Sequence, residues 1–459
     1  MKTDLASINH DIHEVAADTL SAETAPIDLA AFAAARGVKH FLVSFSDLLG
    51  TMRAKLVPAH AIADTCRSGA GFAGFATWLD MTPADPDMFA IPEPSTVVQF
   101  PWKPEVAWVA ADLWINDSPV AQAPRQVLKN TLSRARELGY ELCTGVECEF
   151  FVLSSEVLEL ADRKDRQLKP CYDQRALMRR YDLVAEIADC MHQLGWKPYQ
   201  TDHEDANGQF EMNWQYADAL TTADRQTFFR YMVKTLAEQR GLRATFMPKP
   251  FANLTGNGCH IHLSLWDHDN EQNQFDDPSG ELGLSPLAYS FLAGILHSAP
   301  ALCAITNPTV NSYRRIGAAT TSSGATWSPN TISYTGNNRT HMVRIPGAGR
   351  FEVRLPDGAA NPYLLPAALL AAGLDGIRQS RDPGQRNDTN MYAAGNANGT
   401  APHLPDNLLD ALRAFGASAV LREALGEEFA NSYLKLQNQQ WRAYSSHVSA
   451  WELEHTLDC

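Results

Sequence analysis

Alternating apolar and polar residues along the middle of the chain predict β-strands with one core face and one chemical face. In residues 142–153, Val146, Cys148 and Phe150 alternate with Glu147 and Glu149. Successive side chains of a strand point to opposite sides, so both carboxylates lie on one face, with apolar residues behind them. Paired acids on an apolar-backed strand indicate a metal site, although Glu-x-Glu pairs are also common without a metal.

A second strand, predicted at residues 258–266, carries His260, His262 and Ser264 on one face. Cys259 points with the alternating apolar set, so we expect it in the core rather than as a ligand. A single histidine on a strand is usually structural. Two histidines and a serine that follow a Gly-Asn-Gly loop favour a metal and phosphate site instead.

A third strand, at residues 350–355, places Arg350, Glu352 and Arg354 on one face. A surface ion-pair strip would have the same pattern. The functional interpretation is one carboxylate for a divalent cation, flanked by guanidinium groups that suit phosphate or carboxylate. Further arginines lie on predicted strand ends and loops: Arg314, Arg315, Arg339 and Arg344.

The Asn207-Gly208 dipeptide predicts a two-residue hairpin turn, since both residues accept positive φ. That turn would place Glu204 directly opposite Glu211, where like charges repel. We therefore expect a cation between the two carboxylates. The alternative is a pair of solvated glutamates on a surface hairpin.

The composition of the chain limits which classes of protein it can belong to. The chain has 459 residues, of which 45% are hydrophobic and 20% charged, so it can bury a large core and wholesale disorder is excluded. A formal net charge of −15 argues against nucleic acid or an anionic membrane as partner. The 8 cysteines form no CxxC pair, which is typical of reduced thiols. With no signal peptide or membrane span recognised, we expect a cytoplasmic protein.

The elements predict an α+β protein with a boundary near residue 120. Residues 1–26 form a lead-in, and residues 27–119 a small module with a helix at 27–36 and strands from residue 40 onward. Residues 120–459 form the main domain, with mostly helical structure in the last hundred residues. Its predicted helices span residues 124–138, 174–194, 223–240 and 285–302, and a polar loop spans residues 317–338.

Together these strands offer glutamates, two histidines and several arginines. Oxygen-rich ligand sets favour Mg²⁺ or Mn²⁺, and divalent ions with arginines suit phosphoryl transfer. The chain has neither GxxxxGK[ST] nor GxGxxG, so a P-loop or Rossmann nucleotide site is not expected.

Taken in order, the motifs resemble the glutamine synthetase family, and the match covers nearly the whole chain. The motifs are Glu147-x-Glu149, His203-Glu204 with residues 208–211, Met247-Pro248-Lys249-Pro250, residues 258–264, 307–315, 338–339, 344–346 and 350–357. The resemblance implies an N-terminal β-grasp domain and a catalytic domain built on a curved antiparallel sheet. It also implies a homo-oligomer, expected to be a dodecamer, whose active sites lie between subunits.

The resemblance further implies a role for each matched residue. One metal would be held by Glu149, Glu204 and Glu211, and another by Glu147, His260 and Glu352. L-Glutamate would be bound by Glu149, Gly256, His260, Arg315 and Arg354. ATP would contact His262, Ser264, Arg339 and Arg350. Arg339, Arg344 and Glu352 would act in catalysis. The implied reaction is transfer of the γ-phosphoryl group of ATP to glutamate, after which an amine displaces phosphate from γ-glutamyl phosphate.

Two departures from the family pattern concern the amine. Ammonia-using members carry an Asp in a Phe-Asp-Gly-Ser segment and a Glu on a flap. Here residues 72–75 read Phe-Ala-Gly-Phe, and residues 317–327 contain no acid. Aromatic and small residues replace them, and aromatic faces attract alkylammonium ions. The expected amine pocket consists of Phe75, Trp78, Thr321 and Trp327.

This pattern resembles the branch of the family that ligates glutamate to methylamine, so we expect a short primary amine as acceptor. Alternatives are ammonia bound at a relocated site, and ethylamine, isopropylamine or a polyamine. An aspartate or glutamate that reaches in from elsewhere to occupy the vacated amine end would overturn the expectation of an alkylamine acceptor. A non-enzymatic relative would be expected to lack the metal ligands, and all of them are present. We expect Tyr392, near the site where some relatives are adenylylated, to be an ordinary surface tyrosine.

Overall fold

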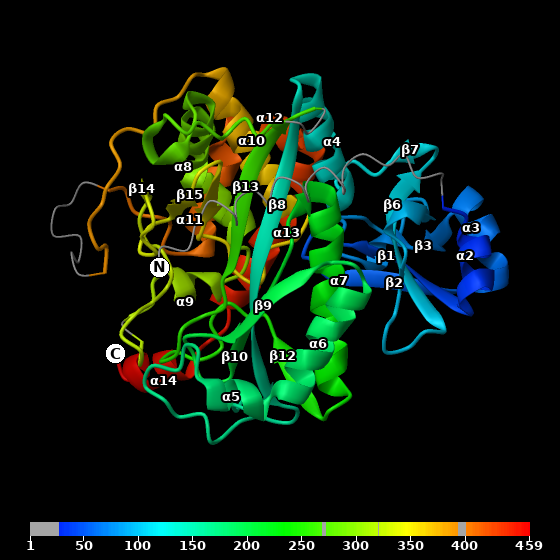
Figure 1. Ribbon diagram of the computed structural model, residues 1–459, viewed down its shortest axis with the longest axis horizontal. Helices are drawn as coiled ribbons and strands as arrows, with labels where there is room; N and C mark the ends of the chain where they lie inside the picture. The colour runs from blue at the N-terminus through cyan, green and yellow to red at the C-terminus, as the bar shows by residue number, and fades with distance from the viewer. Residues whose placement is uncertain (1–26, 269–271, 320, 393–400) are drawn as a thin grey trace, which may run out of the picture.

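The computed structural model describes residues 27–268, 272–319, 321–392 and 401–459, so the predicted lead-in at 1–26 lies outside the described residues. The chain builds two sheets, one in the first part of the sequence and a larger one after it (Figure 1). Helices cover the larger sheet and flank the smaller one, which confirms the predicted α+β class.

The small sheet has the order β2-β1-β6-β4-β3, with β5 and β7 also paired to β6. Its strands are β1 (His40–Ser46), β2 (Met52–Pro58), β3 (Ala70–Phe72), β4 (Met88–Pro92), β5 (Val98–Gln99), β6 (Val106–Ile115) and β7 (Ser118–Pro119). Strands β1 and β6 run parallel, and the other pairs are antiparallel.

Helix α2 (Leu29–Arg36) forms where the sequence predicts it, because both of its ends are capped. The carboxylate of Asp28 accepts hydrogen bonds from the N–H groups of Ala30 and Ala31, and Gly37 ends the helix at φ 70°. The expected single helix is joined by a second, α3 (Ile62–Ser68), which the sequence pattern did not reveal. Only Ile62 of α3 is buried, so the helix has no apolar stripe to detect.

The large sheet has the order β14-β15-β16-β13-β8-β10-β9, and β11 and β12 also pair with β8. Its strands are β8 (Tyr140–Ser154), β9 (Pro198–His203), β10 (Gln209–Trp214), β11 (Ala217–Asp218), β12 (Leu242–Thr245), β13 (Cys259–Asp267), β14 (Tyr334–Thr335), β15 (Val343–Gly347) and β16 (Arg350–Val353). Strands β8 and β13 are the long central pair, visible in the middle of Figure 1.

The helices of the second part are α4 (Pro124–Glu137), α5 (Gln174–Arg179), α6 (Tyr181–Gln193), α7 (Ala219–Glu238), α8 (Pro286–Thr306), α9 (Ser312–Ile316), α10 (Leu364–Arg378), α11 (Leu408–Ala417), α12 (Ala419–Leu425), α13 (Glu427–Ser445) and α14 (Ala450–Thr456). The prediction of one long helix at 174–194 is wrong in one respect. The chain leaves helical geometry at Arg180 (φ −112°, ψ 13°), which separates α5 from α6.

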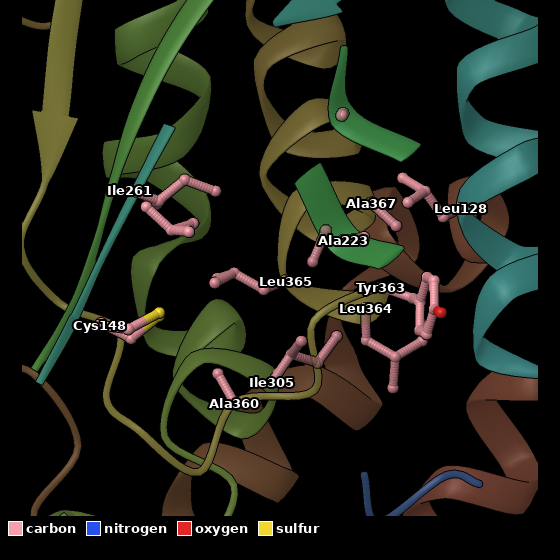
Figure 2. Packing of buried hydrophobic residues seen from close by; sticks show 14 of the residues in the cluster. Leu128, Cys148, Ala223, Ile261, Ile305, Ala360, Tyr363, Leu364, Leu365 and Ala367 are labelled. Atoms are coloured by element: carbon pink, nitrogen blue, oxygen red, sulfur yellow. The ribbon is translucent and has the colours of Figure 1, made fainter. Parts of the chain in front are cut away.

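The apolar face of the large sheet packs on the helices. Figure 2 shows Cys148 of β8 and Ile261 of β13 pointing towards Leu365 of α10, with Ile305 of α8 close by. Cys148 and Cys259 are both buried, so the expectation that Cys259 belongs to the core is confirmed. Because these strands alternate, their opposite face is left for polar side chains.

Helix α8 is long and apolar enough to span a membrane by length and composition. However, 72% of its most apolar 18-residue window is buried inside the protein, where it packs against α10 and α11. The apolar character of α8 is therefore that of a core helix.

A buried ion-pair network joins the two sheets. Arg125, in the first turn of α4, donates to Asp224 of α7 at 3.1 and 3.0 Å and to Asp112 of β6 at 2.7 Å. Tyr363 donates to the same Asp224 at 2.8 Å, and Lys129 donates to Asp112 at 2.6 Å. The guanidinium group thus holds β6 against the helices that support the large sheet.

We expect Arg125→Ala to lower the thermal unfolding midpoint strongly, because it leaves Asp112 and Asp224 buried without their main counter-charge. Breaking a buried pair in this way costs about 3–5 kcal/mol. The control is Lys129→Ala, which removes a partly exposed partner of Asp112 and should cost roughly 1 kcal/mol or less. Differential scanning calorimetry compares the variants, and equal shifts would contradict a special role for Arg125.

Candidate active site

Three adjacent strands of the large sheet bring four predicted site residues together on the polar face. Register pairs His260 with Glu147, and His262 with Glu352. Glu147 bonds both histidines, with 3.2 Å to Nδ1 of His260 and 2.9 Å to Nε2 of His262. The Nδ1 atom of His260 also lies 3.6 Å from Oε1 of Glu352. The alternation seen in the sequence assigns these residues to one face, and the strand register brings them together.

The hairpin between β9 and β10 differs from its prediction. Glu211 lies opposite Asp202, and the predicted pairing of Glu211 with Glu204 is wrong. The loop is longer because only Gly208 has positive φ (73°), while Asn207 does not, so the turn is not the expected two-residue type. Glu204 leaves the strand and enters the site from the loop.

Asp165, from the polar insert after β8, explains the longer loop. It accepts hydrogen bonds from the Gly208 N–H at 2.6 Å and from the Asn207 amide at 2.9 Å. It also bonds Nε2 of the buried His203 at 2.7 Å. These contacts come from a residue about forty positions away in sequence, so local turn chemistry could not reveal them.

Asp202 is a candidate ligand that the sequence analysis missed. One carboxylate oxygen each from Asp202, Glu204 and Glu211 lies within 4.8 Å of the other two. Burial and the neighbouring carboxylates of Glu149 and Glu147 raise the pKa of Asp202 to about 6. Oδ1 of Asp202 is buried and has no hydrogen-bond partner among the residues that the structure describes. The strand register relative to Glu211 is the signal that could have identified it.

Burial also disfavours the charged forms of Glu204 and Glu211, the other two carboxylates of this cluster. Burial, together with Glu149 and Asp202, raises the pKa of Glu204 well above its usual range. Burial and the charges of Glu204, Glu147 and Glu149 do the same for Glu211. Like charges confined without counter-charge are stabilised by a cation, and all-oxygen sets suit Mg²⁺ or Mn²⁺.

The donor atoms fit the divalent cations that the sequence predicts. Two further groups with ligand atoms within 4.8 Å combine Glu147 with Glu211 and His260, and Glu147 with His262 and Glu352. Glu149 belongs to none of these groups. Its Oε2 atom accepts from the Gly258 N–H at 2.7 Å and from Gln209 at 3.1 Å, while Oε1 lies 3.9 Å from Nε2 of His260.

Glu352 is fully buried and is surrounded by cations. Arg344 donates to it at 2.8 Å, and Arg354 donates to its other oxygen. Burial would raise the pKa of Glu352, but Arg354 and His260 lower it to about 2. Burial also opposes the charge on Glu147, yet hydrogen bonds from His260 and His262 hold its pKa well below the usual range. These two carboxylates are therefore ionised at neutral pH.

Arg315 lies buried beside a glycine-rich loop. It donates to the carbonyl groups of Leu355 at 3.0 Å and Arg354 at 3.3 Å. A Cβ on Gly258 would come within 3.1 Å of Arg315, 2.9 Å of Glu149 and 2.8 Å of His260. Only glycine leaves room at this junction. Gly256 is similarly confined, because a Cβ there would meet the Pro248 carbonyl at 2.3 Å.

The residues expected to contact ATP are more open. Arg350 bonds Nδ1 of His262 at 3.0 Å, Ser264 accepts from the Trp266 indole at 3.0 Å, and Arg339 is exposed. Register pairs Ser264 with Cys143. Cys143 also lines a cavity of about 220 Å³, together with Trp196, Tyr216, Asp218 and Arg225.

The expected amine pocket divides between two parts of the chain. Thr321 and Trp327 belong to a loop of residues 321–329, named the flap loop here. Trp327 donates its indole N–H to Asp205, a carboxylate from the hairpin loop. Phe75 and Trp78 belong to the small domain and are 52% and 42% exposed. The hairpin loop of the same chain thus brings the carboxylate of Asp205 to the flap loop, a contact that the sequence analysis did not predict.

The prediction that Tyr392 is an ordinary surface tyrosine is wrong. Its hydroxyl oxygen is buried beside Thr326 and Trp327. Burial raises the pKa of Tyr392, against the opposing effect of Arg354, Arg315 and the adjoining residues Thr326 and Trp327. Tertiary packing therefore places Tyr392 between the flap loop and the arginines of the site.

Comparisons with known proteins agree with this geometry. Residues 121–456 match the family model described as glutamine synthetase, catalytic domain. A glutamine synthetase of Rhizobium leguminosarum bv. phaseoli is 61% identical over 94% of this chain and 99% of its own length. A glutamate–methylamine ligase of Methyloversatilis universalis is 42% identical over 92% of this chain and 96% of its own. A solved complex of GmaS with ADP is 59% identical, with a TM-score of 0.90, covering 94% of this chain and 100% of that one.

We expect Mg²⁺ or Mn²⁺ to raise the thermal unfolding midpoint more at about pH 8 than at about pH 5.5, because metal ligands must lose their protons. Burial and nearby carboxylates raise the pKa of Asp202 to about 6. An unfolded aspartate has a pKa of about 3.9. Between these two pKa values, the carboxylate of Asp202 binds a proton in the metal-free folded protein but not in the unfolded chain. The free energy of unfolding therefore falls as pH rises through about 6. Bound metal offsets that loss.

A pH series of melting curves with and without metal measures this effect. Glu211→Gln should abolish the metal-dependent increase, while Glu137→Gln, on the exposed end of α4, should leave it intact. At about 100 times Kd the stabilisation amounts to about 2.7 kcal/mol. A metal increment that is the same at both pH values would contradict the assignment of this carboxylate cluster.

We expect Glu352→Gln to lower ADP release by about 100-fold or more, the usual effect of losing a positioned charge in a reaction centre. The amide keeps one acceptor oxygen, so one of Arg344 and Arg354 retains its hydrogen bond, whereas alanine would remove both acceptors; glutamine is therefore the milder change and the variant should fold. Size-exclusion chromatography checks assembly and a coupled ADP assay measures turnover. Wild-type turnover in Glu352→Gln would show that these residues form only a structural ion-pair strip.

Proposed function

Because this chain belongs to the glutamine synthetase family, and is therefore a carbon–nitrogen ligase, we propose that it joins the γ-carboxylate of L-glutamate to a short primary amine, with methylamine preferred. ATP supplies the γ-phosphoryl group, and ADP and phosphate are released. The observation that supports the choice of amine is the flap loop, which carries no acid of its own and offers Thr321 and Trp327.

Arginine side chains would bind both substrates, glutamate and ATP. Arg315, Arg354 and the Gly256 backbone would bind glutamate, beside Glu149 and His260. Arg344 is held by Glu352 at 2.8 Å and by Asn337 at 2.9 and 2.7 Å, so its guanidinium group is already oriented. With Arg339 and Arg350, it would stabilise negative charge that spreads over the transferred phosphoryl group.

The clusters around Glu147 and Glu211 would hold divalent cations, whose positive charge would offset that of the phosphate groups. The chain contributes the arrangement of ligands. Glu147 and Glu352 are ionised at neutral pH, whereas Asp202, Glu204 and Glu211 release protons as a cation enters. Substrate binding and metal binding are thus linked to pH in the same site.

We place the nucleotide along β13, with phosphates at His262 and Ser264. The cavity at Cys143 would take the base of the nucleotide, with the partly exposed ring of Tyr216 as a stacking surface. The solved structure of a relative is a complex of GmaS with ADP, which supports nucleotide binding by this chain.

The amine would enter beneath the flap loop. Methylammonium carries one fewer N–H donor than ammonium and one methyl group, so an aromatic wall suits it better than a second carboxylate. Phe75 and Trp78 are exposed in the single chain, as expected of residues that complete a neighbouring subunit's site. We therefore propose a ring-shaped homo-oligomer, a dodecamer, with active sites between subunits.

Ammonia is the second candidate acceptor, and two observations favour it. The relative at 61% identity is a glutamine synthetase. Asp205 brings a buried carboxylate to the flap loop from the hairpin, and an acid at this end suits an ammonium ion. Ethylamine, isopropylamine and polyamines differ from methylamine in the space that they need beside Trp327.

We expect methylamine to have the highest kcat/KM when these amines and ammonia are compared in assays of both ADP release and amide formation. Trp327→Ala should reduce kcat/KM for methylamine by about tenfold, the order of a desolvated cation–π contact, and affect ammonia less. Ammonia serves as the internal control in each variant. If ammonia has the highest kcat/KM in the wild type, the protein is a glutamine synthetase in activity.

A further inference from the structure

A carboxylate outside every recognised motif holds the flap loop in place. Oδ2 of Asp205 accepts from the Thr255 hydroxyl at 3.2 Å, from the Trp327 indole N–H at 2.5 Å and from the Ser323 hydroxyl. Asp205 is only 7% exposed. Three neutral donors thus converge on one buried oxygen, and two of them come from the flap loop.

The flap loop needs this anchor because its own conformation is strained. Trp327 has φ 53°, a left-handed conformation that costs a non-glycine residue about 1–2 kcal/mol. Such a residue keeps this conformation only where its surroundings hold it. The loop is also attached through Ser322, whose N–H and hydroxyl both donate to the Asn253 carbonyl at 3.0 Å.

Asp205 also contacts the ligand cluster. Its backbone N–H donates to Oε2 of Glu204 at 2.9 Å, and Glu204 lies within the group formed with Asp202 and Glu211. One residue therefore touches the candidate metal ligands through its backbone and the flap loop through its side chain.

We infer that Asp205 is a positioning residue that holds the indole of Trp327 over the amine end of the site, and that it thereby decides whether amine or water reaches the acyl phosphate. This inference rests on the proposed function. Attack by the amine nitrogen forms the amide, expels phosphate and releases a proton. Attack by water regenerates glutamate and also expels phosphate, so ADP accumulates without amide.

The test compares Asp205→Ala, Asp205→Asn and Trp327→Phe with the wild type. It measures KM for amine, glutamate and ATP, and the ratio of ADP released to amide formed. The assay uses whichever amine gives the highest kcat/KM. Ser322→Ala is the control, because the Ser322 backbone N–H still holds Asn253 when the hydroxyl is lost.

For Asp205→Ala we expect KM for the amine to rise by about tenfold, the value of a hydrogen bond to a charged group, with KM for ATP within about twofold. The ratio of ADP to amide should rise from about one to several. Asp205→Asn keeps an acceptor oxygen and should fall between wild type and alanine. Trp327→Phe should be affected in the same direction, and the double variant with Asp205→Ala should be no worse than Asp205→Ala alone.

Three outcomes would overturn the inference. The first is an unchanged ratio of ADP to amide with a raised KM for amine, which would make Asp205 a direct amine ligand. The second is an equal rise in all three KM values with loss of the metal-dependent melting shift, which would make it a support of Glu204. The third is full additivity of Asp205→Ala and Trp327→Phe. Failure of the proposed function is distinct, because it appears in the wild type itself, where ammonia would have the highest kcat/KM or no amine would yield amide.

Discussion

Buried carboxylates held close together are the constraint on which this structure depends. Asp202, Glu204 and Glu211 meet within a few ångströms, and burial raises the pKa of all three. A chain gains nothing for its own stability from such an arrangement, since each anion lacks a counter-charge. The arrangement is stable because the opposite face of the same sheet is packed on α8 and α10, and that apolar face fixes the strands (Figure 2).

The site is asymmetric in charge, and the asymmetry has a chemical use. Around Glu147 and Glu352, histidines and arginines balance the carboxylates and keep them ionised. Around Glu211, no such balance exists among the described residues, and burial with the neighbouring carboxylates raises the pKa values of Asp202, Glu204 and Glu211. Cation binding is therefore favoured at one end, while the guanidinium groups at the other end are available for anionic substrates.

Two parts of the chain near the site are held in place by residues that are not among the candidate metal ligands. Arg125 joins β6 of the small sheet to α7 beside the large sheet, so the small domain has a defined position relative to the ligand cluster. The flap loop is fixed by Asp205, which follows directly after a candidate ligand. In both cases a buried charged side chain fixes the position of a segment, and this side chain needs several hydrogen-bond partners at once.

The sequence by itself determined which strands carry the chemistry. Period-two alternation is a local property, so Glu147, Glu149, His260, His262 and Glu352 could be assigned to polar faces without knowledge of the fold. The fold class and most helices followed from the same local patterns and caps, although the break at Arg180 and helix α3 did not.

Only the tertiary structure decided how those faces meet. The hairpin register depends on Asp165, a distant residue that widens the turn and brings Asp202 opposite Glu211. Asp205 and Tyr392 belong to no periodic pattern, and their side-chain partners lie in distant segments of the chain. Hydrogen bonds and charges between remote segments arise from packing, so a pattern along the chain cannot reveal them, whereas the alternation of a strand is already present in its sequence.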